Sequence, residues 1–245
     1  MTHESTAQFD VIVIGGGVAG LSAALFTARH GLETLSIDAG GSILRRNAHL
    51  ENVPGFPVGV DGRRFLDLLK EQADRAGASY QEGTVTGLER LADTFAVETD
   101  TMQYQTEYAI AATKNEVDYL EDVDGVGIVD RGKTFVDTDE RGRTGIAGLY
   151  AAGRLAGKPH QAAVCAGHGA EVGVTILEDH DRPFYHDWVA PDGYFTDRGR
   201  DLPPGCEEID AAERERRAEA SRAVMQEHFA EPHPGEQLTH PSLSE

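Results

Sequence analysis

Three glycines and one aspartate have the spacing of a site that binds a nucleotide diphosphate. Gly15, Gly17 and Gly20 form a G-x-G-x-x-G pattern, and Asp38 follows eighteen residues later. In this pattern the first glycine permits a tight turn, the second leaves room for a diphosphate, and the third allows close helix packing. The aspartate can accept hydrogen bonds from ribose hydroxyls. We therefore predict a dinucleotide held by Gly15, Gly16, Gly17, Val18, Ala19, Gly20 and Asp38.

The surrounding residues predict the strand–turn–helix–strand unit that such a site requires. Residues 11–14 are an apolar, mostly β-branched run, which is typical of a parallel strand buried on both faces. Residues 21–29 indicate a helix, and residues 34–37 a second strand that ends at Asp38. The helix N-terminus offers free N–H groups and partial positive charge to phosphates. The pattern alone does not separate NAD from FAD, and a glycine-rich turn in an unrelated α/β fold is the alternative.

The charge balance argues against two classes of partner. The 245 residues include 42 acids against 22 lysines and arginines, for a net charge of −20. Such a chain repels nucleic acids and anionic membranes, so we expect neither as a partner. The acid-rich and lysine-poor composition is typical of haloarchaeal, halophilic cytosolic proteins. An ordinary acidic cytosolic protein is the alternative.

The cysteines and the apolar runs indicate a cytoplasmic protein without a structural metal. Cys165 and Cys206 lie far apart and form no C-x-x-C, so neither a disulfide framework nor a zinc site is expected. No apolar run has the length of a membrane span, and the first residues lack the basic and apolar regions of a secretion signal.

A second motif resembles a segment of the thioredoxin reductase-like flavoproteins. Residues 51–57 read ENVPGFP, and residues 63–76 predict an amphipathic helix. The resemblance implies that Asn52 of this E-N-x-P-G motif binds a flavin. A proline-bearing loop in which Asn52 caps a turn is the alternative. Alternating segments within residues 79–111 predict an antiparallel meander, which in that family crosses over the FAD domain and would bring the backbone near Val85 to the adenine.

The following strand, residues 108–115, ends in a variant of a family motif. The family usually has Ala-Thr-Gly there, whereas this chain has Ala112-Thr113-Lys114. The resemblance implies a cofactor contact at Thr113, with a backbone approach altered by Lys114. Thioredoxin reductases then insert an NADPH-binding domain with a C-x-x-C. Residues 115–148 are too short for such a domain and predict a hairpin. The chain thus resembles the FAD domain alone, without a dithiol relay.

Residues 143–177 resemble the closing motif of the family with one important exception. Gly153, Gln161 and Ala162 are retained as cofactor contacts, but Arg154 replaces the aspartate that bonds the ribityl chain. Arginine accepts no hydrogen bond. Three alternatives remain: Arg154 pairs with the diphosphate, or it points to solvent and weakens FAD binding, or the site has lost its flavin.

Three further residues near the closing motif have ordinary interpretations. Cys165 is expected as a small buried core residue, and His160 as a solvated loop residue. Neither His160 nor His168 is assigned a catalytic role, and the catalytic residues are unknown.

The predicted fold is α/β: a Rossmann-like FAD-binding domain with a parallel central sheet and an antiparallel meander, followed by an irregular and helical arm. Residues 1–8 form a polar extension, 9–179 the domain, 180–230 the arm with a charged helix over 207–229, and 231–245 a disordered tail. Five aromatic residues are expected to pack the arm onto the domain or a neighbouring subunit, which is compatible with a homodimer: Phe184, Tyr185, Trp188, Tyr194 and Phe195.

Three functions fit these patterns. The first is an FAD-dependent oxidoreductase that takes electrons from diffusible NAD(P)H or a separate redox protein, with a small molecule or a protein as redox partner. The second is a non-catalytic regulatory module that binds a flavin or a dinucleotide. The third is an NAD-only binder, which leaves the Asn52 loop unexplained.

Overall fold

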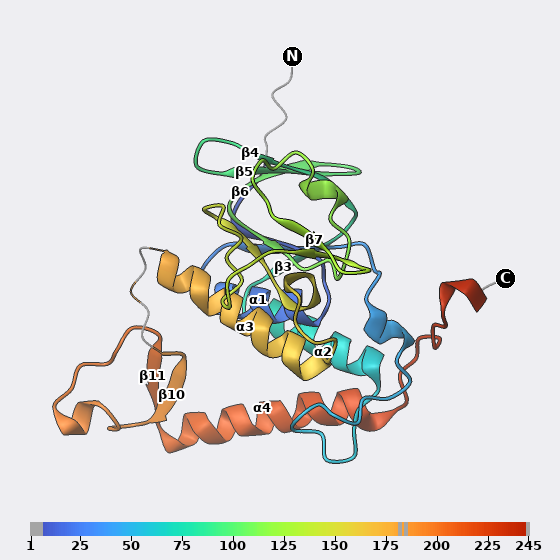
Figure 1. Cartoon of the computed structure of the whole chain (residues 1–245). Helices are drawn as coiled ribbons and strands as arrows, with labels where there is room; N and C mark the ends of the chain where they lie inside the picture. Colours follow the sequence, from blue (N-terminus) through green and yellow to red (C-terminus); the bar gives the residue numbers. More distant parts are fainter. Residues whose placement is uncertain (1–6, 181–182, 184–185, 244–245) are drawn as a thin grey trace. The chain divides into compact units, whose positions relative to one another are not determined.

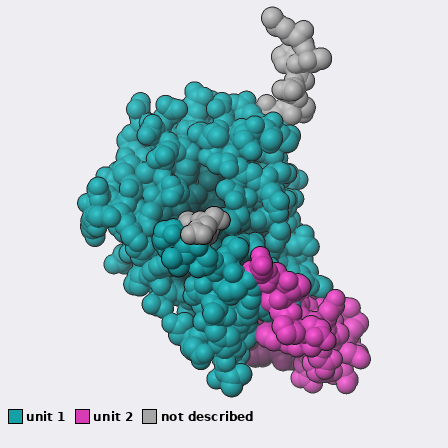
Figure 2. All heavy atoms as spheres, turned by 90° about the vertical axis from the view of Figure 1, so that its right-hand side faces the viewer, with its two compact units in different colours: residues 1–176, 237–245 teal, residues 177–236 magenta. Residues whose placement is uncertain are grey.

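The computed structural model describes residues 7–180, 183 and 186–243. The chain divides into two compact units, one formed by residues up to 176 together with those from 237 onward, the other by residues 177–236 (Figure 2). Within the described ranges, no helix combines the length and the apolar character needed to cross a membrane.

A seven-stranded sheet forms the centre of the first unit. Its order is β3-β2-β1-β6-β5-β4, with β9 paired to β6. The pairs β1–β2, β1–β6, β2–β3 and β6–β9 are parallel, whereas β4–β5 and β5–β6 are antiparallel. The predicted combination of a parallel sheet and an antiparallel meander is confirmed. The strands are β1 (Ala7–Ile14), β2 (Thr34–Asp38), β3 (Ser79–Glu82), β4 (Val85–Arg90), β5 (Phe95–Thr99), β6 (Gln103–Ala111) and β9 (Leu149–Ala151).

The strand β6 joins the parallel and antiparallel parts. One of its edges pairs with β1, and the other is shared between β5, opposite residues 103–106, and β9, opposite residues 109–111. Although β3 and β4 stand at opposite ends of the strand order, only Gly83 and Thr84 connect them. Two residues span at most about 7 Å, so the meander must fold back over the sheet. The prediction that residues 79–82 begin the meander is wrong, because they form a parallel edge strand beside β2.

Three helices pack beneath the strands in the view of Figure 1: α1 (Val18–Arg29), α2 (Gly62–Arg75) and α3 (Ala162–Asp179). The helix α1 starts three residues earlier than predicted, directly at the glycine loop, and β1 starts at Ala7 rather than at residue 11. The predicted hairpin within residues 115–148 is formed by β7 (Ile128–Asp130) and β8 (Thr134–Val136). Short 3-10 turns complete the unit: η1 (Ile43–Arg46), η2 (Asp118–Leu120), η3 (Gly153–Ala156) and η5 (Pro241–Leu243).

Glycines allow α1 to approach both its strand and α3. A Cβ on Gly20 would stand 1.9 Å from the carbonyl oxygen of Gly15, and one on Gly169 would stand 2.1 Å from that of Ala19. Both neighbouring atoms belong to backbone and cannot rotate away. The sequence pattern identified Gly20, whereas the small residues of α3 gave no comparable signal for Gly169.

The second unit contains a two-stranded parallel sheet and one long helix. The strands β10 (Trp188–Pro191) and β11 (Cys206–Ile209) pair in parallel, and η4 (Thr196–Arg198) lies between them in the chain. The helix α4 spans Ala211–Ala230 and buries no side chain. The expectation of a helix from residue 207 is therefore wrong over its first residues, which belong to β11.

Aromatic residues of the arm pack against one another within this unit. The rings of Trp188, Tyr194 and Phe195 meet edge to face, with centroids 4.6 to 5.6 Å apart. Such T-shaped pairs add to the stability that burial alone supplies. The predicted aromatic residues Phe184 and Tyr185 lie outside the described residues.

Candidate functional site

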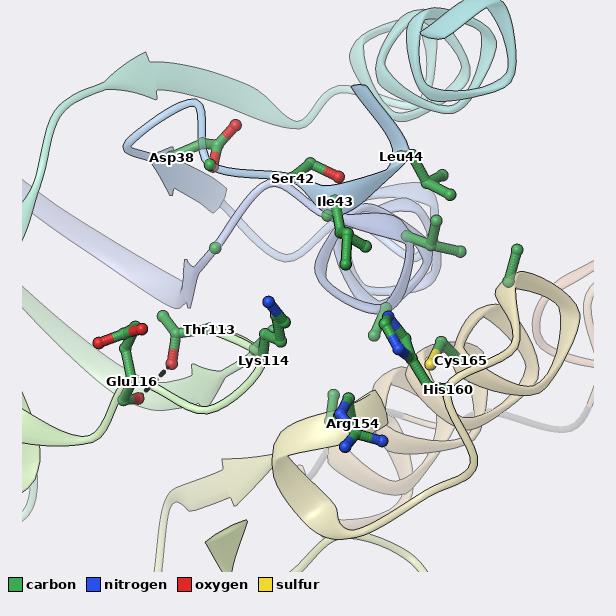
Figure 3. A pocket seen from close by; sticks show the side chains of 18 of the residues that line it. Asp38, Ser42, Ile43, Leu44, Thr113, Lys114, Glu116, Arg154, His160 and Cys165 are labelled. Atoms are coloured by element: carbon green, nitrogen blue, oxygen red, sulfur yellow. Dashed lines mark hydrogen bonds between the residues drawn. The ribbon is translucent and has the colours of Figure 1, made fainter. Parts of the chain in front are cut away.

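A cavity of about 880 Å³ opens where β1 and β2 end and α1 begins (Figure 3). Ligands of open parallel sheets bind in this place, outside the carboxyl ends of the strands. The structure brings eleven of the fourteen predicted site residues to the wall of this cavity: Gly15, Gly17, Val18, Ala19, Asp38, Asn52, Val85, Thr113, Arg154, Gln161 and Ala162. Gly16, Gly20 and Gly153 are the three that do not line it.

The glycine loop leaves the start of α1 open to a ligand. Gly17 is the N-cap and makes no side-chain cap, and the first turn holds no acidic residue. A Cβ on Gly17 would meet nothing closer than Ser42 Oγ at 3.9 Å. The first N–H groups of a helix need a partner, so this uncapped start fits a diphosphate.

The other glycines of the loop serve packing. A Cβ on Gly15, whose φ is +114°, would lie 2.7 Å from the carbonyl oxygen of Ala112. One on Gly16 would lie 2.6 Å from the Cβ of Asp38. Gly16 and Gly20 therefore shape the loop without facing the cavity.

Asp38 is buried at the end of β2 and held by a tyrosine that sequence reasoning missed. Its Oδ2 accepts a 2.8 Å hydrogen bond from the hydroxyl of Tyr80 in β3. Burial, and then the bond to Asp38, raise the pKa of Tyr80, so the phenol stays a donor. A carboxylate can accept several hydrogen bonds, so Asp38 can accept further ones at the cavity wall. Residues 79–82 alternate like a strand of the meander, so the local pattern does not indicate that Tyr80 lies beside Asp38.

The two flavoprotein motifs meet in the cavity wall. Asn52 Nδ2 donates a 2.8 Å hydrogen bond to Gln161 Oε1, across 109 residues of sequence. Val85 lines another part of the wall, beside Gly83 and Thr84. The side chain of Thr113 is already engaged, because its Oγ1 donates to the carbonyl oxygen of Glu116 at 2.6 Å.

Arg154 lies in the wall and leaves the cavity open. Its guanidinium carbon is 5.6 Å from the ring centroid of Phe135 in β8, and its Nε is buried without a hydrogen-bond partner. The preceding residue, Gly153, has φ +63° and donates its N–H to His168 Nδ1 at 2.9 Å. His168 is thus a buried residue of α3 that holds the turn before Arg154.

Two side chains in the same wall have shifted pKa values. Burial lowers the pKa of His160, and the nearby charges of Arg154 and Lys114 lower it further. Burial raises the pKa of Cys165, so its thiol stays protonated and is a poor nucleophile. In the parts of the chain that are described, no three His, Cys, Asp or Glu side chains gather as a metal site would require.

Comparisons with known proteins agree with this geometry. Residues 10–49 match a family model described as an FAD binding domain. The thioredoxin reductase of Treponema pallidum (strain Nichols) is 36% identical over 112 residues, covering 44% of this chain and 36% of that protein. The thioredoxin reductase of Aquifex aeolicus (strain VF5) is 39% identical over 88 residues, covering 35% and 27%. The chain spans about a third of the length of these curated relatives.

A solved structure shows the same fold. A thioredoxin reductase from Gloeobacter violaceus has a TM-score of 0.66 at 17% identity, covering 74% of this chain and 100% of that chain. The fold is therefore the Rossmann-like FAD-binding fold seen in thioredoxin reductase structures. The family model indicates FAD as the cofactor, and the open helix start and the oriented Asp38 carboxylate fit it.

Proposed function

We propose that this chain is an FAD-dependent oxidoreductase that receives electrons from diffusible NAD(P)H or from a separate redox protein. The observation that carries the proposal is a single cavity in which the glycine loop and Asp38 meet the Asn52 and Gln161 pair. The first two recognise the nucleotide half of a flavin dinucleotide. The second two recognise its flavin half.

Each part of the wall has a distinct task. The N-terminus of α1 binds the diphosphate, and Asp38 accepts hydrogen bonds from the ribose hydroxyls. The backbone around Val85 faces the adenine. The bound flavin supplies the hydride and electron chemistry, and the protein positions it and excludes water. The N-terminus of α3, which begins at Ala162, favours negative charge at the pyrimidine end of the ring.

Reduction proceeds in this proposal without a dithiol of the chain's own. Cys165 is the one thiol in the described cavity wall, and its raised pKa keeps it protonated. A protonated thiol cannot relay electrons by disulfide exchange. The electron acceptor is therefore a small molecule or a separate protein that meets the flavin directly.

The same observation on Cys165 favours a second candidate, a non-catalytic module that binds a flavin as a regulator. The two candidates differ in whether the bound flavin exchanges electrons with a donor.

The test is a visible spectrum of the purified protein, followed by NADH, NADPH and reduced redox proteins without oxygen. A flavin band that bleaches with a donor supports the oxidoreductase. A band that persists with every donor supports the regulatory module. If no flavin band is present and added FAD does not bind, both candidates are wrong.

A matched variant links the band to the cavity. Gly17→Val places a side chain in the proposed diphosphate space, where the nearest other atom is Ser42 Oγ at 3.9 Å from the Cβ. Because φ of Gly17 is −82°, valine fits its backbone. We expect this variant to stay folded and to lose the flavin band.

A further inference from the structure

In a strongly acidic chain, the cavity wall carries basic side chains as well as the carboxylates of Asp38, Glu51 and Glu116. Lys114 and Arg154 both line it, and His160 lies within electrostatic range of both. Lys114 follows β6, whereas Arg154 and His160 both lie between β9 and α3, and Figure 3 shows the three side chains around the same space. Lys114 is also one of only four lysines in a chain of 42 acids and 22 lysines and arginines.

Neither cation has a carboxylate partner within the described ranges. Arginines elsewhere pair with acids, as Arg63 does with Asp61 at 2.7 Å and Arg217 with Glu207 at 2.6 Å. Lys114 and Arg154 form no such pair among the described residues, although acids outnumber bases nearly twofold. The Nε of Arg154 is buried without a hydrogen bond, which costs free energy unless a ligand supplies the acceptor.

The backbone conformation of Lys114 also supports a ligand site here. Its φ of +68° makes it the one non-glycine residue in the left-handed region among those described. Glycine adopts this conformation at lower cost, so the lysine here carries local backbone strain. Strain of this kind is concentrated at ligand sites, where the side chain has a task.

We propose that Lys114, Arg154 and His160 form a phosphate-binding subsite within the cavity. The planar fork of Arg154 can donate two parallel hydrogen bonds to a phosphate, Lys114 adds a point charge, and His160 adds an N–H donor. The phosphate belongs either to the diphosphate of a bound flavin dinucleotide or to a free phosphorylated compound. The first source rests on the proposed function, whereas the second does not.

The test measures the affinity of the whole chain for three ligands by flavin fluorescence and calorimetry: FAD, riboflavin and inorganic pyrophosphate. The variants are Lys114→Gln and Arg154→Gln. Arg90→Gln is the control, because Arg90 is exposed, does not line the cavity and carries the same charge. Circular dichroism verifies that each variant is folded.

We expect each cavity variant to weaken binding of FAD or pyrophosphate about tenfold, to leave riboflavin binding unchanged, and to differ from the control. Loss of FAD affinity alone identifies the cofactor's own diphosphate as the ligand. Loss of pyrophosphate affinity identifies a free phosphate compound as a ligand. If pyrophosphate binding depends on Lys114 while the wild-type chain binds no FAD, the subsite stands and the proposed function is wrong.

Two results overturn the subsite: unchanged affinities for both phosphate ligands, or an equal loss for riboflavin, which would reflect cavity shape. If a variant does not fold, the salt dependence of the wild-type chain replaces it. Salt screens charges, so FAD or pyrophosphate affinity should fall with salt while riboflavin affinity should not. Equal salt responses of the phosphate ligands and riboflavin contradict the proposal.

Discussion

The contact between α1 and α3 offers a sharp test of how the cavity is held together. A Cβ on Gly169 would stand 2.1 Å from the carbonyl oxygen of Ala19, in the first turn of α1. Nothing lies within 4 Å of a Cβ on Gly167, two residues earlier in the same helix. The variants Gly169→Ala and Gly167→Ala therefore make the same chemical change with and without a clash.

The two substitutions are expected to change the free energy of unfolding in opposite directions. Alanine in place of glycine stabilises a helix by about 1 kcal/mol, which is the full effect expected at Gly167. At Gly169 the backbone oxygen cannot rotate away, so the overpacking cost is about 3 kcal/mol, at the upper end of the usual range. The net effect there is a loss of about 2 kcal/mol, and the two variants differ by about 3 kcal/mol.

Thermal and urea unfolding, followed by circular dichroism, measure this difference. For a unit of this size it corresponds to about 6–12 °C in melting temperature. Because Ala19 also lines the cavity, Gly169→Ala should weaken FAD binding while Gly167→Ala should not. Equal stability of the two variants would refute the proposed close approach of α3 to α1.

Three further predictions concern single side chains. Asp61 is the N-cap of α2, and its bond to Arg63 lowers the pKa of this carboxyl group to about 2. The ionised Asp61 therefore stabilises the fold above about pH 4, and this stabilisation is lost as pH falls toward 2. Asp61→Ala should cost about 1 kcal/mol at pH 7 in urea unfolding, and a difference that survives below pH 2 contradicts this. Burial lowers the pKa of His168, and its neutral ring accepts a hydrogen bond from the N–H of Gly153. The stabilisation of the fold by neutral His168 is therefore lost as pH falls below 6.5, the ordinary pKa of histidine. His168→Gln should remove that loss between pH 8 and pH 5, and parallel stability curves for the two proteins speak against it. Asp38→Asn should weaken FAD binding about tenfold in a fluorescence titration and leave riboflavin binding unchanged, and an equal loss for riboflavin rejects the ribose contact.

The first strand, turn and helix were readable from local sequence because their signals are local. A β-branched run, a glycine spacing and a terminal acid all lie within thirty residues, and each residue type follows from backbone geometry. The ends were less accurate, since α1 begins at Val18 and β1 at Ala7. Pairing to β6 extends β1, and no local pattern records which strand lies beside it.

The meander and the arm show where local reasoning failed. Residues 79–82 alternate like the strands after them, yet they pair with β2 and supply Tyr80 to Asp38. Residues 206–209 carry helix-forming acids, yet they pair with β10. In both places a partner strand elsewhere in the chain determined the outcome, because hydrogen bonding between strands outweighs a weak local preference.

The sequence by itself therefore determined the class of fold, the glycine loop and the identity of eleven residues in the cavity wall. Only the tertiary structure decided that Asn52 contacts Gln161 and that Gly169 lets α3 pack closely against α1. It also decided that Lys114 and Arg154 line one cavity. The reason is physical. Turn geometry and hydrophobic periodicity act between neighbours in the chain, whereas close packing and charge act between atoms that only folding brings together.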